Sequence, residues 1–144
     1  LLEKNKDLFE FFKFMIDYRK KHPVIRKKLD NAVCGMEAMH AHDVNAERME
    51  VPQNAKTLAV SFAGYDRKKG KDDLVYVAVN AYWEEVKITL PNLANHGAWY
   101  LSVDTYGDEK GKYFYQEGEE IRIDREYVMK PRSIVVFTGR EILR

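Results

Sequence analysis

The apolar residues of this chain change their spacing once, near Pro23, and this change limits the fold more than any other feature of the sequence. Before Pro23 they recur at helical spacing. From Thr57 onward many of them alternate with polar residues, which is the period of a β-strand. No helical pattern separates the later strands, and parallel strands need such crossover connections. The sequence therefore predicts one N-terminal helix followed by an all-β domain with antiparallel strands.

The N-terminal pattern predicts an amphipathic α-helix over about residues 6–21, with Asn5 as a candidate cap and Pro23 as the stop. Its apolar residues spread over an arc of roughly 220°, about twice the stripe that one contact surface requires. We therefore expect cover on two sides, and a carboxylate or carbonyl partner for Arg19, which lies near the middle of the arc. The apolar set is Leu8, Phe9, Phe11, Phe12, Phe14, Met15, Ile16 and Tyr18.

The second half of the chain predicts six or seven short strands joined by turns, which is typical of an antiparallel β-sandwich. The charged stretch 65–73 predicts a solvated loop, and the run 74–79, apolar on both faces, predicts a central strand. The expected organisation is a terminal helix (1–23), an irregular link (24–56) and a β-sandwich (57–144). Further strands are expected over 57–62, 86–90, 99–103 and 133–138, with shorter ones near Phe114 and over 121–123.

The composition excludes several classes of function. The 144 residues carry a formal net charge of +1, which gives no electrostatic case for nucleic acid. No apolar run approaches the ~18 residues of a membrane-spanning helix. The single cysteine, Cys34, excludes an intrachain disulfide and favours a reducing compartment, so we expect a cytoplasmic protein. The chain opens on Leu1 rather than Met, and we expect a fragment or a processed product.

The polar residues give no pattern for catalysis. His40, His42 and Asp43 are spaced to converge on one face of a strand, but a metal site needs three or four ligands and no second cluster supports it. The adjacent carboxylates at 84–85 and 119–120 point to opposite faces of a strand, unlike the facing pair of a glycosidase, and are expected to be solvated. We therefore expect no catalytic residue, no metal and no cofactor.

The aromatic residues leave three interpretations open. Tyr82 and Trp83 lie between two predicted strands, where they would form a stacking platform for a sugar ring, pack the end of the sandwich, or cover a neighbouring domain. Packing is the favoured interpretation. Trp99 begins a strand and is expected in the core, although it remains a weak candidate for sugar contact.

Several short motifs follow one another in an order known from one enzyme family. They are Tyr18 to Pro23, Asn80 to Glu84, Leu90-Pro91, Trp99, Asp104-Thr105 and Pro131 to Val136. Together they resemble the C-terminal part of isoamylase-type glycogen and starch debranching enzymes, members of the α-amylase superfamily (glycoside hydrolase family 13). The resemblance covers nearly the whole chain. Two departures are Met39-His40-Ala41, where the family commonly carries Trp-His-Gly, and Tyr18 in place of Phe.

This resemblance implies that residues 1–23 are the last helix of a (β/α)₈ barrel and that the sandwich is a C-terminal accessory domain. The parent enzyme would hydrolyse α-1,6-glucosidic branches with barrel carboxylates, and no position of this chain matches those motifs. The implied partner is the missing barrel, with α-glucan as a candidate ligand. The alternatives are an independent carbohydrate-binding module and a protein-interaction domain. Without the barrel, we expect self-association through the Phe-rich helix, or poor order of that helix.

Overall fold

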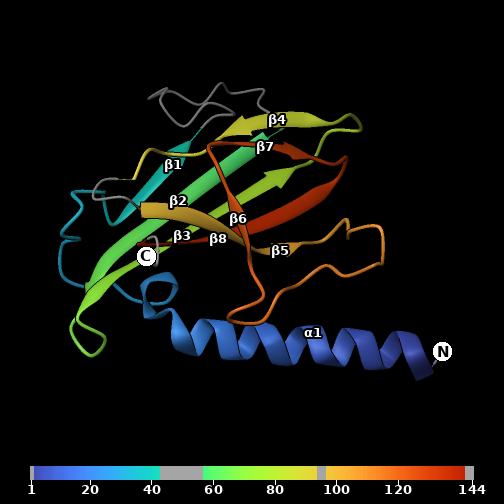
Figure 1. Cartoon of the computed structure of the whole chain (residues 1–144), viewed down its shortest axis with the longest axis horizontal. Helices are drawn as coiled ribbons and strands as arrows, with labels where there is room; N and C mark the ends of the chain where they lie inside the picture. The colour runs from blue at the N-terminus through green and yellow to red at the C-terminus, as the bar shows by residue number, and fades with distance from the viewer. Residues whose placement is uncertain (1, 43–56, 94–96, 142–144) are drawn as a thin grey trace.

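A computed structural model describes residues 2–42, 57–93 and 97–141 of the chain. One helix, α1 (Leu2–Lys21), precedes a short 3-10 turn, η1 (Pro23–Ile25), and all the described strands follow (Figure 1). Every strand pairing among them is antiparallel, as the sequence predicts. The strands are β1 (Met39–His42), β2 (Thr57–Asp66), β3 (Lys71–Asn80), β4 (Val86–Thr89), β5 (Gly97–Asp104), β6 (Ile121–Ile123), β7 (Glu126–Met129) and β8 (Ser133–Glu141).

The strands form two packed sheets. The larger sheet has the order β1-β2-β3-β8-β5-β6, and the smaller sheet pairs β4 with β7. β3 lies between β2 and β8, which confirms the central strand predicted from its apolar pattern. The main core lies between the sheets because alternate residues of the larger sheet point toward β4 and β7. Its largest members are Tyr76, Ile88, Leu90, Trp99, Leu101, Met129, Val135 and Phe137.

Helix α1 covers part of the opposite face of the larger sheet. Phe14 and Tyr18 of the helix pack with Val75, Val103 and Val136 in a second apolar cluster. Figure 1 shows α1 running beneath the strands, with the N-terminus at its outer end. Within the described residues, no helix is both long and apolar enough to cross a membrane. The architecture is thus a β-sandwich with one helix on its outer face, which confirms the predicted fold class.

The structure differs from the sequence prediction at several element boundaries. Helix α1 begins at Leu2, so Asn5 lies inside the helix and is not its cap. The link contains an edge strand, β1, which pairs with β2 and whose four residues are too few and too polar to predict. Strand β7 was not predicted either. The short strand expected near Phe114 is reduced to an isolated bridge between Phe114 and Val103.

The stretch predicted as a solvated loop is mostly strand. Strand β2 continues to Asp66 and β3 begins at Lys71, leaving a tight turn in which Gly70 has a φ of +66°. Asp66 and Asp73 are buried there. The prediction was wrong because charged residues in a long hairpin face each other and the link, rather than only water.

Candidate functional site

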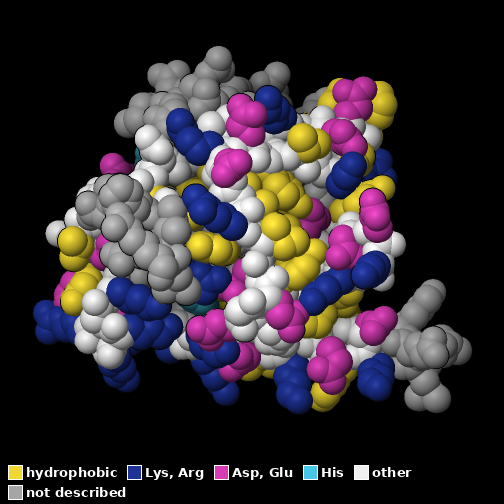
Figure 2. Space-filling view, in the orientation of Figure 1, with side chains coloured by type: hydrophobic (Ala, Val, Ile, Leu, Met, Phe, Trp, Pro, Cys, Tyr) yellow, Lys and Arg dark blue, Asp and Glu magenta, His cyan; other side chains and the backbone are white. Residues whose placement is uncertain are grey.

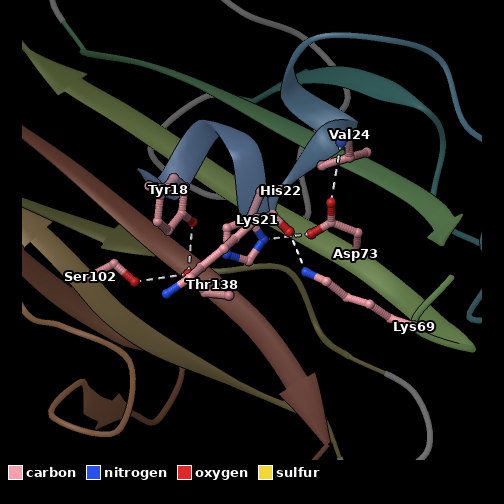
Figure 3. Close-up of polar contacts among 8 residues, drawn as sticks. All are labelled: Tyr18, Lys21, His22, Val24, Lys69, Asp73, Ser102 and Thr138. Atoms are coloured by element: carbon pink, nitrogen blue, oxygen red, sulfur yellow. Dashed lines mark hydrogen bonds and ion pairs between the residues drawn. The ribbon is translucent and has the colours of Figure 1, made fainter. Parts of the chain in front are cut away.

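The end of α1 is fastened to the larger sheet by a buried carboxylate. Nδ1 of His22 lies 2.7 Å from Oδ1 of Asp73, and the backbone N–H of Val24 donates to Oδ2 of Asp73 at 3.2 Å (Figure 3). The Asp73 side chain is 4% exposed, so both of its oxygens are satisfied inside the protein. The backbone on both sides of Pro23 is thereby held against the start of β3.

A second polar link lies one helical turn earlier. The hydroxyl of Tyr18 is 2.7 Å from Oγ1 of Thr138, which is itself 2.8 Å from Oγ of Ser102 (Figure 3). Burial raises the pKa of Tyr18 far above its usual value, so the phenol stays neutral and can donate. This chain of hydroxyls joins α1 to β8 and β5 through the apolar cluster. The sequence pattern does not indicate this link, because Ser102 and Thr138 are ordinary strand residues.

A cavity of about 550 Å³ lies beside these two links. Lys21 at its rim pairs with Asp17 at 3.0 Å and with Glu117 at 3.4 Å. The ammonium of Lys69 donates to the carbonyl of Lys21, the last residue of the helix. These polar groups at the rim are paired with one another, so the arrangement holds the helix in place and offers no activated nucleophile.

The two histidines of β1 lie on one face of the strand, as their spacing predicts. Their ring centroids are 4.7 Å apart. Nδ1 of His40 is 3.0 Å from a carboxylate oxygen of Glu37, and Nε2 of His42 is 2.8 Å from Oγ of Ser61. Asp43, the third candidate ligand, lies outside the described residues. Over the described ranges, no group of three or more His, Cys, Asp or Glu side chains is arranged to hold a metal.

The paired carboxylates have different surroundings. Glu85 is exposed and pairs with Lys130 at 2.8 Å, and Glu119 pairs with Lys112 at 2.5 Å. The Glu120 side chain is only 6% exposed and lies 2.7 Å from Arg140. The expectation that all these carboxylates are solvated is therefore wrong for Glu120, because Arg140 of β8 supplies a cation beside it.

The aromatic loop between β3 and β4 is organised by Asn80. This buried amide donates through Nδ2 to the carbonyls of Glu84 at 3.0 Å and Lys130 at 3.1 Å. Its Oδ1 accepts the N–H of Tyr82 at 3.0 Å. The carbonyl of Tyr82 in turn accepts the N–H of Arg132 at 3.0 Å. A single asparagine thus fixes the loop against the start of β8, which fixes the position of the adjacent aromatic residues.

Trp83 projects from this loop and is 64% exposed. Its ring centroid lies 5.5 Å from that of Tyr82, which is half-buried. Trp83 therefore does not pack the end of this sandwich, and of the two packing interpretations only cover for a neighbouring domain stays a prediction. The local sequence could not predict this exposure. The direction of a side chain in a turn depends on the conformation of the turn, and the residue type alone does not reveal it.

Trp99 lies in the main core, as expected, and is 2% exposed. Its indole N–H donates to the carbonyl of Pro91 at 2.8 Å. A Cβ on Gly139 would lie 3.0 Å from the Trp99 ring and 2.9 Å from Cβ of Leu74, so a glycine is needed where the indole crosses β8. With its ring enclosed in this way, Trp99 presents no face to a sugar.

Helix α1 and the sheet beneath it expose apolar surface on the same side of the molecule. Arg19 of the helix is exposed, so it does not need the carboxylate or carbonyl partner that was expected for a buried arginine. On the sheet, Leu58, Val79 and Ile134 are directly opposed cross-strand neighbours on the helix-side face, beyond the part that α1 covers. Four helix residues, which we call the apolar flank, are each more than half exposed: Leu8, Phe9, Phe12 and Ile16.

A comparison with protein-family models places this architecture in a known group. The model described as "Isoamylase, C-terminal" matches residues 36–138. No curated protein matches the chain. The match spans the sandwich from before β1 to within β8 and leaves α1 and η1 outside it. Because the match covers well over half of the sequence, the chain belongs to the isoamylase C-terminal domain family.

Proposed function

We propose that this chain is the accessory C-terminal region of a debranching glycoside hydrolase that acts on α-1,6-glucosidic branches of glycogen or starch. In this proposal the chain itself is non-catalytic. The observation that carries it is the family match over residues 36–138, together with a helix outside the match that is fastened to the sandwich through His22 and Asp73. The chemistry would belong to a barrel that precedes the sandwich.

The apolar flank of α1 gives this barrel a place to pack. A helix exposing four large apolar side chains is unusual for a surface element, which normally turns one apolar stripe inward and polar residues outward. The opposite side of α1 carries Phe14 and Tyr18, which are already buried against the sheet, so the apolar flank is the side left for such a partner. Leu58, Val79 and Ile134 form a second exposed apolar row, on the helix-side face of the larger sheet.

Sugar contact at the aromatic loop is a second candidate function. Trp83 is exposed on a loop that Asn80 holds in one conformation, and ordered aromatic faces of this kind suit stacking on a sugar ring. Tyr82 lies beside it and carries a hydroxyl for hydrogen bonding. In this role the loop would hold α-glucan near the barrel, or would serve an independent carbohydrate-binding module.

Under this proposal the gene encodes a barrel before residue 1, and the test compares the longer protein that includes it with residues 1–144 on pullulan and amylopectin. We expect reducing-sugar release from the longer protein and none from residues 1–144. Replacing Phe12 and Ile16 by Asp in the longer protein should lower its thermal stability, because the barrel contact is lost. A longer protein without a barrel would contradict the proposal. So would hydrolysis by the chain alone that a point substitution within it abolishes.

A further inference from the structure

Seven cationic side chains surround a hollow of about 560 Å³ at one corner of the molecule. They come from three segments that are distant in sequence: the end of α1, the segment after η1 and the β2–β3 turn. Figure 2 shows Lys and Arg side chains gathered at this corner, whereas both signs of charge alternate over much of the same face. The cationic corner consists of Lys20, Arg26, Lys27, Lys28, Arg67, Lys68 and Lys69.

The backbone holds these segments together, so the corner is part of the fold. The N–H of Tyr65 donates to the carbonyl of Asp30 at 2.8 Å, and the two residues form an isolated bridge. Gly64 allows this approach, because a Cβ there would lie 2.7 Å from Cβ of Leu29. The ammonium of Lys69 also donates to the carbonyl of Lys21. The segment after η1 is therefore fixed alongside the hairpin turn.

The two carboxylates in the lining already have partners. Oδ1 of Asp66 accepts the backbone N–H groups of Lys68 at 3.0 Å and Lys69 at 3.3 Å, which closes the turn. Asp30 is paired with Arg67. Among the described residues, the remaining cations of the lining have no ion-pair partner. These are Lys20, Arg26, Lys27, Lys28 and Lys68.

Ordinary structural needs do not explain this concentration of charge. A helix C-terminus attracts cations, but that effect falls off within the last turn and accounts only for Lys20. Arg26, Lys27 and Lys28 follow the helix, and Lys68 belongs to the hairpin. The chain as a whole carries a formal net charge of only +1, whereas the lining of this corner has seven cations and two carboxylates. Five unpaired like charges repel one another, and a bound anion would relieve that repulsion.

We propose that the cationic corner is a binding site for phosphate monoesters. A phosphate monoester carries about −1.5 to −2 charge near neutral pH and three acceptor oxygens, which suits several converging cations. The Arg26 guanidinium offers a bidentate fork, and the surrounding lysines offer point charges. Nucleic acid is a poorer match because its backbone needs a longer basic track than one corner provides. The phosphate would belong either to a free sugar phosphate or to a phosphorylated glucan.

The test measures amide chemical shifts of the chain by NMR during titration with inorganic phosphate and with glucose 6-phosphate at constant ionic strength. We expect saturable shifts confined to residues 19–28 and 66–71. Replacing Lys27, Lys28 and Lys68 together by Gln should weaken binding by about tenfold, because three of the unpaired charges are removed. Retention of the chain on phosphorylated and on dephosphorylated glucan then distinguishes the two sources of phosphate.

A matched triple variant provides the control. Lys6, Lys13 and Lys110 are exposed and lie outside the corner, so replacing them by Gln changes net charge equally. We expect this variant to bind glucose 6-phosphate within about twofold of the unaltered chain. Equal weakening by the two triple variants, or shifts spread over all basic residues, would overturn the proposal. Absence of saturable binding would also overturn it, as would tighter binding of a single-stranded oligonucleotide than of glucose 6-phosphate.

Discussion

His22 and Asp73 are separated by 51 positions in the sequence, yet Nδ1 of His22 lies 2.7 Å from Oδ1 of Asp73. This contact joins the end of α1 to the start of β3. The same carboxylate holds the backbone N–H of Val24, directly after Pro23. The histidine and proline belong to the motif that resembles the close of the last barrel helix in debranching enzymes. Their structural role in this chain is to direct the helix onto the outer face of the sandwich.

Replacing Asp73 by Ala should destabilise the protein by about 2–4 kcal/mol, because it removes two hydrogen bonds and leaves a buried N–H and an imidazole without their acceptor. Urea unfolding followed by tryptophan fluorescence measures the loss. Asp124 is exposed, and its replacement by Ala should change the free energy of unfolding by less than about 0.5 kcal/mol. Equal effects of the two substitutions would show that the junction contributes nothing specific.

Two buried tyrosines, Tyr18 and Tyr76, should respond differently to loss of their hydroxyl groups. Tyr18→Phe should cost about 1–2 kcal/mol, because the hydroxyl of Thr138 loses one of its two buried partners and keeps only Ser102. Tyr76→Phe should be neutral or stabilising, because the Tyr76 hydroxyl is buried without a hydrogen-bond partner in the part of the chain that the structure describes. Thermal unfolding of both variants is the measurement, and a larger loss for Tyr76→Phe would contradict this expectation.

Alanine substitutions of the two tryptophans should have different effects on the free energy of unfolding. Trp99→Ala should cost about 3–5 kcal/mol, because it opens a cavity in the core. Trp83→Ala should cost less than about 1 kcal/mol, because most of the ring already lies in water. If Trp83 stacks on sugar, the same variant should also lose retention on a glucan affinity gel. Unchanged retention would exclude the aromatic loop as a glucan contact.

The apolar flank should make the isolated chain self-associate. Light scattering at increasing protein concentration should show dimers or larger species, because four large apolar side chains of α1 are exposed. Replacing Phe12 and Ile16 by Asp should return the chain to a monomer with an unchanged melting temperature. Val128 is an exposed apolar residue on β7, and its replacement by Asp serves as the control that leaves association intact. If the unaltered chain is monomeric, the apolar flank does not mediate self-association.

The single cysteine should react slowly with alkylating reagents. Burial raises the pKa of the Cys34 thiol, and the nearby Asp72 carboxylate raises it further. A raised pKa lowers the thiolate fraction at pH 8, so iodoacetamide should react more slowly with the folded chain than with the urea-unfolded chain. The rate for the folded chain should keep rising at pH values where the unfolded chain has reached its plateau. Coincident pH profiles would contradict the shift.

Much of the fold was predictable because the hydrophobic pattern is local information. The helix before Pro23, the central strand 74–79 and the antiparallel arrangement all follow from the spacing of apolar residues and the absence of crossover helices. The motifs that carried the resemblance were equally local, and the family match over residues 36–138 confirms it. The buried position of Trp99 was also expected, because it begins a strongly apolar strand.

The tertiary structure decided which face of each strand is buried in the main core. Leu58 lies near the start of a strand with alternating apolar residues, yet its side chain points away from the main core. Ala59 and Ala63 of the same strand face that core instead. Alternation shows that two faces differ, but only the neighbouring layers determine which face is covered.

The polar contacts and charged surfaces also depend on which distant segments of the chain meet. The partner of His22, the exposure of Trp83 and the cationic corner all arise where segments far apart in the chain meet. The sequence by itself determined the helix, the longer strands and the family. Which side chains those elements bring together was decided only by tertiary packing, because long-range contacts fix neighbours that no local pattern encodes.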